Sequence, residues 1–188
     1  MIQEMVNGSI AVLTQPSVQA FERHERDNLV WALIYAVIAS VINGVIVAFS
    51  SLLSGGGISE LIAIILSAVL STIIGSLIGW GIIYLLGRAF GGTGSFGELA
   101  WGLSLFSSPL AVGQGIATVI PFIGGIISLA LTLYGVYLTY LAIQSGMNLP
   151  AQKALYIAII LAVIGILIVC ATVGLATIAI LLGGGFAP

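Results

Sequence analysis

Charged residues are scarce in this sequence, and their scarcity excludes most soluble folds. Only 5% of the 188 residues are charged, whereas 60% are hydrophobic and the mean hydropathy is +1.28. A soluble globular chain carries about 25% charged residues. Beyond position 27 the charged residues are Glu60, Arg88, Glu98 and Lys153. Most of the uncharged stretches between these residues are longer than the ~20 apolar residues needed to cross a bilayer. The sequence therefore predicts an integral membrane protein.

Other absences narrow the range of functions. Four basic residues and a net charge of −2 cannot neutralise a phosphate backbone, so nucleic acid is not an expected partner. The single cysteine, Cys170, excludes an internal disulfide, and the single histidine, His24, has no second histidine or cysteine near it for a metal site. No ionisable residue falls at hydrocarbon depth, which disfavours ion-coupled carriers. We therefore expect no catalytic, cofactor-binding or metal-binding residue and no enzyme activity.

Hydropathy and turn residues predict an all-α polytopic membrane protein with five transmembrane helices. The spans are expected at about 29–53, 61–87, 99–118, 122–143 and 154–182, followed by an outer tail at 183–188. Pro121 divides the uncharged stretch after Glu98, which is too long for one crossing. A helix over 154–182 would be ~43 Å long, so we expect it to tilt or to break near Gly174.

Residues 1–28 are expected to form a short amphipathic segment before the first span. A helical stripe of apolar side chains runs through its first half and consists of Ile2, Met5, Val6, Ile10 and Leu13. Such a helix can lie in the lipid interface or pack against the bundle. The polar face is weakly acidic and is not attracted to anionic lipid, which favours packing against the bundle.

The basic residues predict the orientation of the chain. With five spans, Arg23, Arg26, Arg88 and Lys153 all fall on the side of the N-terminus, and the other side has none. Short loops rich in lysine and arginine stay in the cytoplasm. We expect a cytoplasmic N-terminus and an external C-terminus, in a membrane that is most simply a prokaryotic plasma membrane.

Small residues at every fourth position predict close helix packing. One stripe lies in the second span and another in the first, and they consist of Ser67, Ser71, Gly75 and Gly79, and of Ser40, Gly44 and Ala48. Asn43, Gln114 and Tyr134 are candidates for a polar interior. They either form separate interhelical hydrogen bonds or, for Asn43 and Gln114, line a polar pathway or ligand pocket.

The loop before the third span is rich in glycine. Its Gly92 to Gly97 segment fits G-x-G-x-x-G, but a membrane span rather than a strand precedes it, and the position 20 residues later lies in another span. A dinucleotide site needs the strand–loop–helix context. We therefore interpret these glycines as a tight connection between two spans.

Several segments resemble the Yip family (Ypt/Rab-interacting membrane proteins) in its prokaryotic form. They cover nearly all the chain in order: VLTQPSVQAFE (12–22), GGTGSFGELAWGL (91–103), SSP (107–109), IPFIGGIISLALTLYGVYLTYLAIQ (120–144) and SGMNLPAQKAL (145–155). The positions that match the family's loop and break motifs are Gly92, Gly94, Phe96, Pro109 and Pro121. The DLYGP segment of eukaryotic members is missing, so binding of a Rab-type GTPase is not expected.

The resemblance implies five spans, a cytosolic N-terminus and a role in organising membranes or recruiting partners. Two hypotheses follow. The first is a non-enzymatic membrane protein, an organising or accessory subunit, whose partners are the bilayer and either other membrane subunits or copies of itself. The alternative is a passive conduit or lipid-handling protein that uses Asn43, Gln114 and the third span, which glycine and proline weaken.

Overall fold

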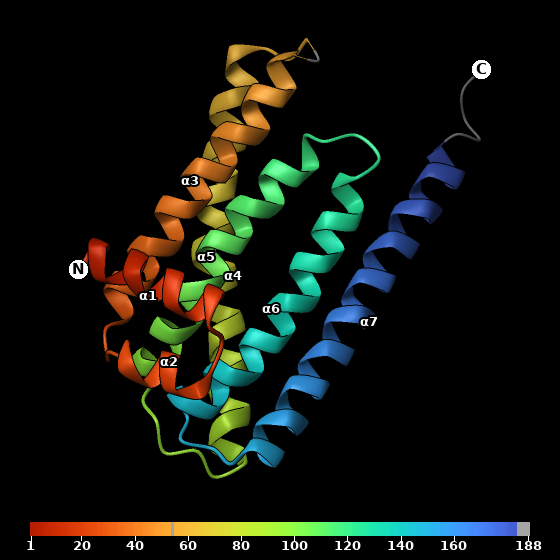
Figure 1. The fold of residues 1–188 in the computed structure, drawn as a ribbon. Helices are drawn as coiled ribbons and strands as arrows, with labels where there is room; N and C mark the ends of the chain where they lie inside the picture. The colour runs from red at the N-terminus through yellow and green to blue at the C-terminus, as the bar shows by residue number, and fades with distance from the viewer. Residues whose placement is uncertain (54, 184–188) are drawn as a thin grey trace.

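The computed structural model describes residues 1–53 and 55–183, and this part of the chain is helical without strands. The predicted all-α class is confirmed. The helices are α1 (Ile2–Thr14), α2 (Val18–Arg23), α3 (Leu29–Leu53), α4 (Ile58–Ala89), α5 (Phe96–Thr118), α6 (Gly124–Gly146) and α7 (Ala151–Gly183). Helices α3 to α7 run alternately up and down as a bundle, while α1 and α2 lie against its side (Figure 1).

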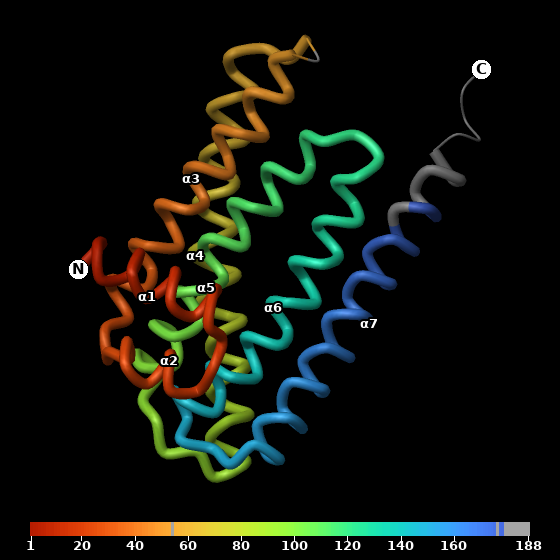
Figure 2. The backbone as a smooth tube through the Cα atoms, viewed as in Figure 1, coloured from red at the N-terminus to blue at the C-terminus, as the bar shows by residue number. Residues whose placement is uncertain are grey.

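One end of the bundle gathers the basic residues beyond α2, and we call it the basic end. Lys153 Nζ donates to the Phe90 carbonyl at 2.8 Å, and Arg88 Nη1 donates to the Gly92 carbonyl at 3.3 Å. The loops after α4 and α6 therefore meet here, as the backbone trace also shows (Figure 2). The turns after α3 and α5 lie at the opposite end, which we call the far end.

Four helices are long and apolar enough to cross a membrane: α3, α4, α6 and the part of α7 from Ala151 to Leu175. Helix α5 has the same 23-residue length as α6 but is less apolar. It also has many buried residues, because it lies between α3 and α6 with α1 across it. A helix that is screened from lipid needs no apolar surface. Five crossings remain a prediction.

Residues that favour turns mark the ends of the helices. The α5–α6 turn contains Pro121 and Phe122, and Phe122 has a φ of 64°. Helix α7 continues through Gly174 without the break that was the alternative to tilting. Its length therefore favours a tilted crossing. The outer tail was predicted at 183–188. Gly183 ends α7, and the rest of the predicted tail lies outside the described residues.

Helix α1 packs on the bundle through a different face from the one expected. Its buried residues are Met5, Gly8, Ser9 and Val12. Of the predicted apolar stripe only Met5 is buried, whereas Ile2, Val6 and Ile10 are exposed. The small side chains of Gly8 and Ser9 let α1 approach α5 closely, with Leu105 against Gly8. The helix packs against the bundle, and contact of its exposed apolar row with the lipid interface stays a prediction.

Glycines bring the backbone segments at the basic end into direct contact. A Cβ on Gly94 would collide with the Gly146 carbonyl oxygen, and one on Gly97 would collide with the Asp27 carboxylate. The buried Trp101 side chain donates from Nε1 to the His24 carbonyl at 2.7 Å. These contacts fasten the segment before α3 and the end of α6 to the start of α5.

We predict that Gly94→Ala destabilises the fold, because the added methyl group meets backbone that cannot rotate away. Overpacking costs about 1–3 kcal/mol, which thermal unfolding in detergent measures as a lower melting temperature. Gly81→Ala is the matched control, since nothing lies within 4 Å of its added Cβ. Equal melting temperatures for the two variants would contradict the packing described here.

Candidate functional site

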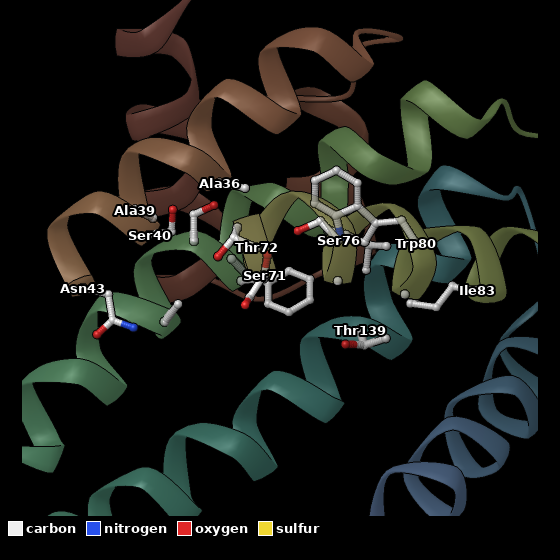
Figure 3. Close-up of a pocket in the computed structure, with 17 residues that line it drawn as sticks. Ala36, Ala39, Ser40, Asn43, Ser71, Thr72, Ser76, Trp80, Ile83 and Thr139 are labelled. Carbon is white, nitrogen blue, oxygen red and sulfur yellow. The ribbon is translucent and has the colours of Figure 1, made fainter. Parts of the chain in front are cut away.

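A cavity of about 430 Å³ lies between α3, α4 and α5, with one residue from α6 (Figure 3). Its wall combines small and hydroxyl side chains with the aromatic rings of Trp80 and Phe106. The polar residues that line it are Ser40, Asn43, Ser71, Thr72, Ser76, Ser107, Ser108 and Thr139. So many hydrogen-bonding groups around one space at the depth of the spans make it the candidate site.

Two of these polar groups are buried without a partner. Within the described part of the chain, Asn43 Oδ1 and Ser108 Oγ make no hydrogen bond. By contrast, Ser40 Oγ donates to the Val37 carbonyl at 2.8 Å and Thr139 Oγ1 to the Gly135 carbonyl at 2.8 Å. An unpaired buried polar group costs free energy wherever water is excluded. The two unpaired atoms therefore cost the folded chain free energy.

The position of Asn43 depends on a glycine in the facing helix. Asn43 Oδ1 lies directly against Gly115 of α5, so close that a Cβ at Gly115 would overlap it. Gly115 is buried. The contact holds the amide between α3 and α5 at the far-end limit of the cavity.

The other two candidates for a polar interior lie elsewhere. Gln114 Nε2 donates to Thr132 Oγ1 at 3.1 Å, between α5 and α6. Tyr134 Oη donates to the Leu13 carbonyl at 2.6 Å and so fastens the last turn of α1 to α6. Neither residue lines the cavity. The structure therefore separates Asn43 from Gln114, although the sequence allowed them one shared pocket.

The two small-residue stripes face in different directions. Ser40, Gly44 and Ala48 of α3 are buried. Gly44 lies against α4, where an added Cβ would be 3.3 Å from the Ile65 Cα atom. This stripe closes the α3–α4 contact.

The stripe on α4 faces outward instead. Ser67, Ser71 and Gly75 are exposed and Gly79 is partly exposed. Nothing lies within 4 Å of a Cβ added at Gly75 or Gly79. No described helix packs directly on the stripe, and Ser71, Gly75 and Gly79 instead form part of the cavity wall.

The glycine-rich loop motif closes the basic end through backbone hydrogen bonds and a ring contact. Gly92 N donates to the Gly87 carbonyl at 2.8 Å, and Thr93 N donates to the Met147 carbonyl at 3.0 Å. Phe96 meets Tyr84 edge to face, with ring centroids 5.5 Å apart. The start of α5 has a capping box, in which Ser95 accepts from Glu98 N and the Glu98 carboxylate accepts from Ser95 N.

The two motif prolines have different settings. Pro109 lies inside α5, directly after Ser108, and has no N–H to donate to the Leu105 carbonyl. Pro121 lies in the turn between α5 and α6, where its carbonyl accepts from Ile123 N at 2.7 Å. Pro109 therefore follows a residue of the cavity wall, whereas Pro121 lies in the turn at the far end.

A second, more polar hollow of about 450 Å³ lies at the basic end, beside α1 and α2. Glu25 lines it together with Arg23, His24 and Arg26. Burial, and then repulsion from Glu98 and Glu22, raise the pKa of the Glu25 carboxyl, and a hydrogen bond from Ser145 opposes them. A search of the described residues for three or more histidine, cysteine or acidic side chains able to hold a metal ion finds none.

The apolar helices and their arrangement define an integral membrane protein of the all-helical class. A family model described as the Yip1 domain matches residues 10–173. The chain therefore belongs to the Yip1 domain family, and the resemblance carried by the loop motifs is confirmed. Comparisons with curated proteins and with solved structures find no match.

Sequence reasoning missed most of the cavity wall. Ser108, Thr72, Ser76 and Thr139 are hydroxyl residues within apolar spans, and such residues commonly bond to their own helix. The one available signal was the Ser107–Ser108–Pro109 triplet, because proline frees a carbonyl beside two hydroxyl groups. Only the three-dimensional arrangement shows that these residues share a space with Asn43.

We predict that Gly115→Ala lowers the melting temperature through its clash with Asn43, at a cost of about 1–3 kcal/mol. Asn43→Ala in the same chain removes the clashing atoms, so the double variant should recover stability relative to Gly115→Ala alone. Gly113→Ala is the control, since its Cβ lies 3.4 Å from the nearest atom. Strictly additive effects of the two substitutions would disprove the contact.

The raised pKa of Glu25 predicts a pH dependence of stability. Because ionising Glu25 is less favourable in the folded chain than in the unfolded chain, stability falls as pH rises above the usual glutamate pKa of about 4.3. Glu25→Gln should therefore melt at a higher temperature than the wild type at pH 7. The difference should shrink as the pH falls toward 4. Parallel melting curves at all pH values would contradict this explanation.

Proposed function

We propose that the protein is non-enzymatic and acts by binding other membrane proteins side to side, as an organising or accessory subunit. The single observation that carries the proposal is the uncovered stripe on α4. Its small residues let a second helix approach to backbone contact, which is how helices associate where lipid removes the hydrophobic driving force. The absence of ionisable groups among the residues lining the central cavity supports a role without catalysis.

The side chains next to the stripe on α4 are suited to contact with a second helix. Large apolar side chains of α4 flank it and are exposed, among them Leu70, Ile74 and Ile78. Small residues between large ones form a groove into which the side chains of another helix fit. Only Trp80 and Gly87 of α4 are buried, so almost its whole length is available.

We also propose that the basic end lies in the cytoplasm of a prokaryotic plasma membrane. Arg88 and Lys153 are held there by backbone carbonyls, and Arg26 pairs with Glu4 at 2.9 Å nearby. The excess of basic residues on cytoplasmic loops supports this orientation.

Passive conduction or lipid handling is the second candidate. The observation that favours it is the cavity with its unpaired Asn43 and Ser108 side chains. Gln114 does not contribute, because it bonds to Thr132 outside the cavity. Flux or lipid scrambling at background level in proteoliposomes would dispose of this alternative.

The main proposal predicts the mass of the particle in its own membrane. Native mass spectrometry of nanodiscs cut directly from cells should find the 19.3 kDa chain in a larger assembly with itself or with a defined partner. Gly75→Leu should release it as a monomer, because the added side chain prevents close approach. Gly81→Leu, on another face of the same helix and equally open, should leave the assembly intact. A wild-type chain that is strictly monomeric and without a partner would refute the proposal.

A further inference from the structure

The segment between α2 and α3, residues 24–28, lies against the start of α5, and we call it the strap. The Trp101 side chain donates from Nε1 to the His24 carbonyl at 2.7 Å. The Asp27 carboxylate lies against Gly97, so close that a Cβ at Gly97 would overlap it. None of the residues of the strap is itself buried. Specific contacts, rather than burial in the core, therefore hold the strap on the bundle.

Four carboxylates meet where the strap contacts the bundle, and they belong to Glu22, Glu25, Asp27 and Glu98. Arg23 and Arg26 are near them in the sequence, but neither forms an ion pair with any of the four. Among the described residues, the ion pairs join Glu4 to Arg26 and to the N-terminal ammonium group. The negative charges at this contact are therefore not compensated by a paired cation.

Glu25 is the carboxylate that lies between the strap and the bundle. It accepts a hydrogen bond from Ser145, which is buried near the end of α6. Burial, and then repulsion from Glu98 and Glu22, raise the pKa of Glu25. Its ionised form is therefore less stable on the bundle than in water. Because Glu25 also lines the polar hollow of about 450 Å³, protons can reach it without crossing the bundle.

The helices before the strap are fastened separately. Phe21 of α2 is 2% exposed and meets Phe106 edge to face, with ring centroids 6.2 Å apart. Helix α1 is held at its end by Tyr134, which donates to the Leu13 carbonyl at 2.6 Å. The strap can therefore leave α5 while α1 and α2 stay in place, which is a local opening rather than unfolding of the chain.

We propose that the strap is a pH-sensitive switch, which is closed on α5 while Glu25 is protonated and opens when Glu25 ionises. Opening breaks the hydrogen bond from Trp101 to the His24 carbonyl and uncovers the start of α5 to water. The acidic groups that face Glu25 from α2 and α5 both favour opening, and α6 contributes the uncharged Ser145. The switch does not rest on the lateral association proposed above, since no residue of α4 takes part.

The direction of the pH dependence follows from linkage. Glu25 has its ordinary pKa in the open strap and a raised pKa in the closed strap. The closed state is therefore fully favoured below the usual glutamate pKa of about 4.3. Opening increases as the pH rises from there to the raised pKa, and then levels off.

The test is exchange of the Trp101 indole N–H with water, followed by NMR on the full chain with isotope-labelled tryptophan in detergent micelles. The chain has 3 tryptophans, and Trp31→Phe and Trp80→Phe identify the other two signals. Glu25→Gln keeps an oxygen for the Ser145 hydroxyl but cannot ionise. Trp101 should exchange severalfold faster in the wild type than in Glu25→Gln at about pH 7, and equally fast near pH 4. Comparison at one pH cancels the dependence of the chemical exchange rate on pH.

Two further variants sharpen the test. Glu60→Gln is the matched control at the far end, where the Glu60 carboxylate accepts from Ser51 Oγ at 3.0 Å, and it should behave as the wild type. Glu98→Gln removes one repelling charge, while glutamine can still accept from Ser95 N in the capping box. In this variant the increase in exchange should be smaller and should level off at a lower pH.

Three results would overturn the proposal. The first is an equal exchange rate of Trp101 in the wild type and in Glu25→Gln at every pH, which would assign any switch to another group, such as His24 in the same hollow. The second is an equal acceleration of all the indole signals, since the whole fold would then loosen. The third is a Glu98→Gln curve identical to that of the wild type.

Discussion

Close approach of backbones is the interaction on which this structure depends. In a bilayer, burying one apolar side chain against another gains little over contact with lipid, so helices are held by tight packing and hydrogen bonds. The chain supplies both at its basic end, where Gly94 lies on Gly146 and Gly97 on Asp27. The loops that meet there fix the relative positions of α4, α5, α6 and α7. The cavity lies farther along the bundle, between α3, α4 and α5.

The helices and their connections could be predicted from the sequence because glycine, proline and charge mark the ends of apolar stretches directly. The face that each helix buries could not be predicted from the sequence. The stripes of α3 and α4 have the same spacing, yet Gly44 is buried and Gly75 is exposed. In soluble proteins polarity distinguishes the two faces, but in lipid both are apolar. The same ambiguity explains α1, whose buried face contains Gly8 and Ser9 in place of the most apolar row.

Helix α5 shows why hydropathy alone can leave out a helix of a membrane bundle. It carries Glu98, several serines and Pro109, which lower its hydropathy. Each polar feature near its start has a local partner, such as the capping box of Ser95 and Glu98 and the carbonyl that Ser104 uses. A helix surrounded by others can hold such residues without facing lipid. The exception is Ser108, and its unpaired hydroxyl could not be deduced from its sequence neighbours, since a serine usually bonds to its own helix.

The two surfaces that stand out, the outward stripe of α4 and the cavity behind it, are not independent. Ser71, Gly75 and Gly79 belong to both, since they form the stripe and also line the cavity. A helix that packs on the stripe would therefore also cover the side of the cavity that these residues form. Linkage then requires a ligand in the cavity to change the affinity of that helix by the same factor. The coupling would act by sterics alone, because the residues that line the cavity include no aspartate, glutamate, lysine, arginine or histidine.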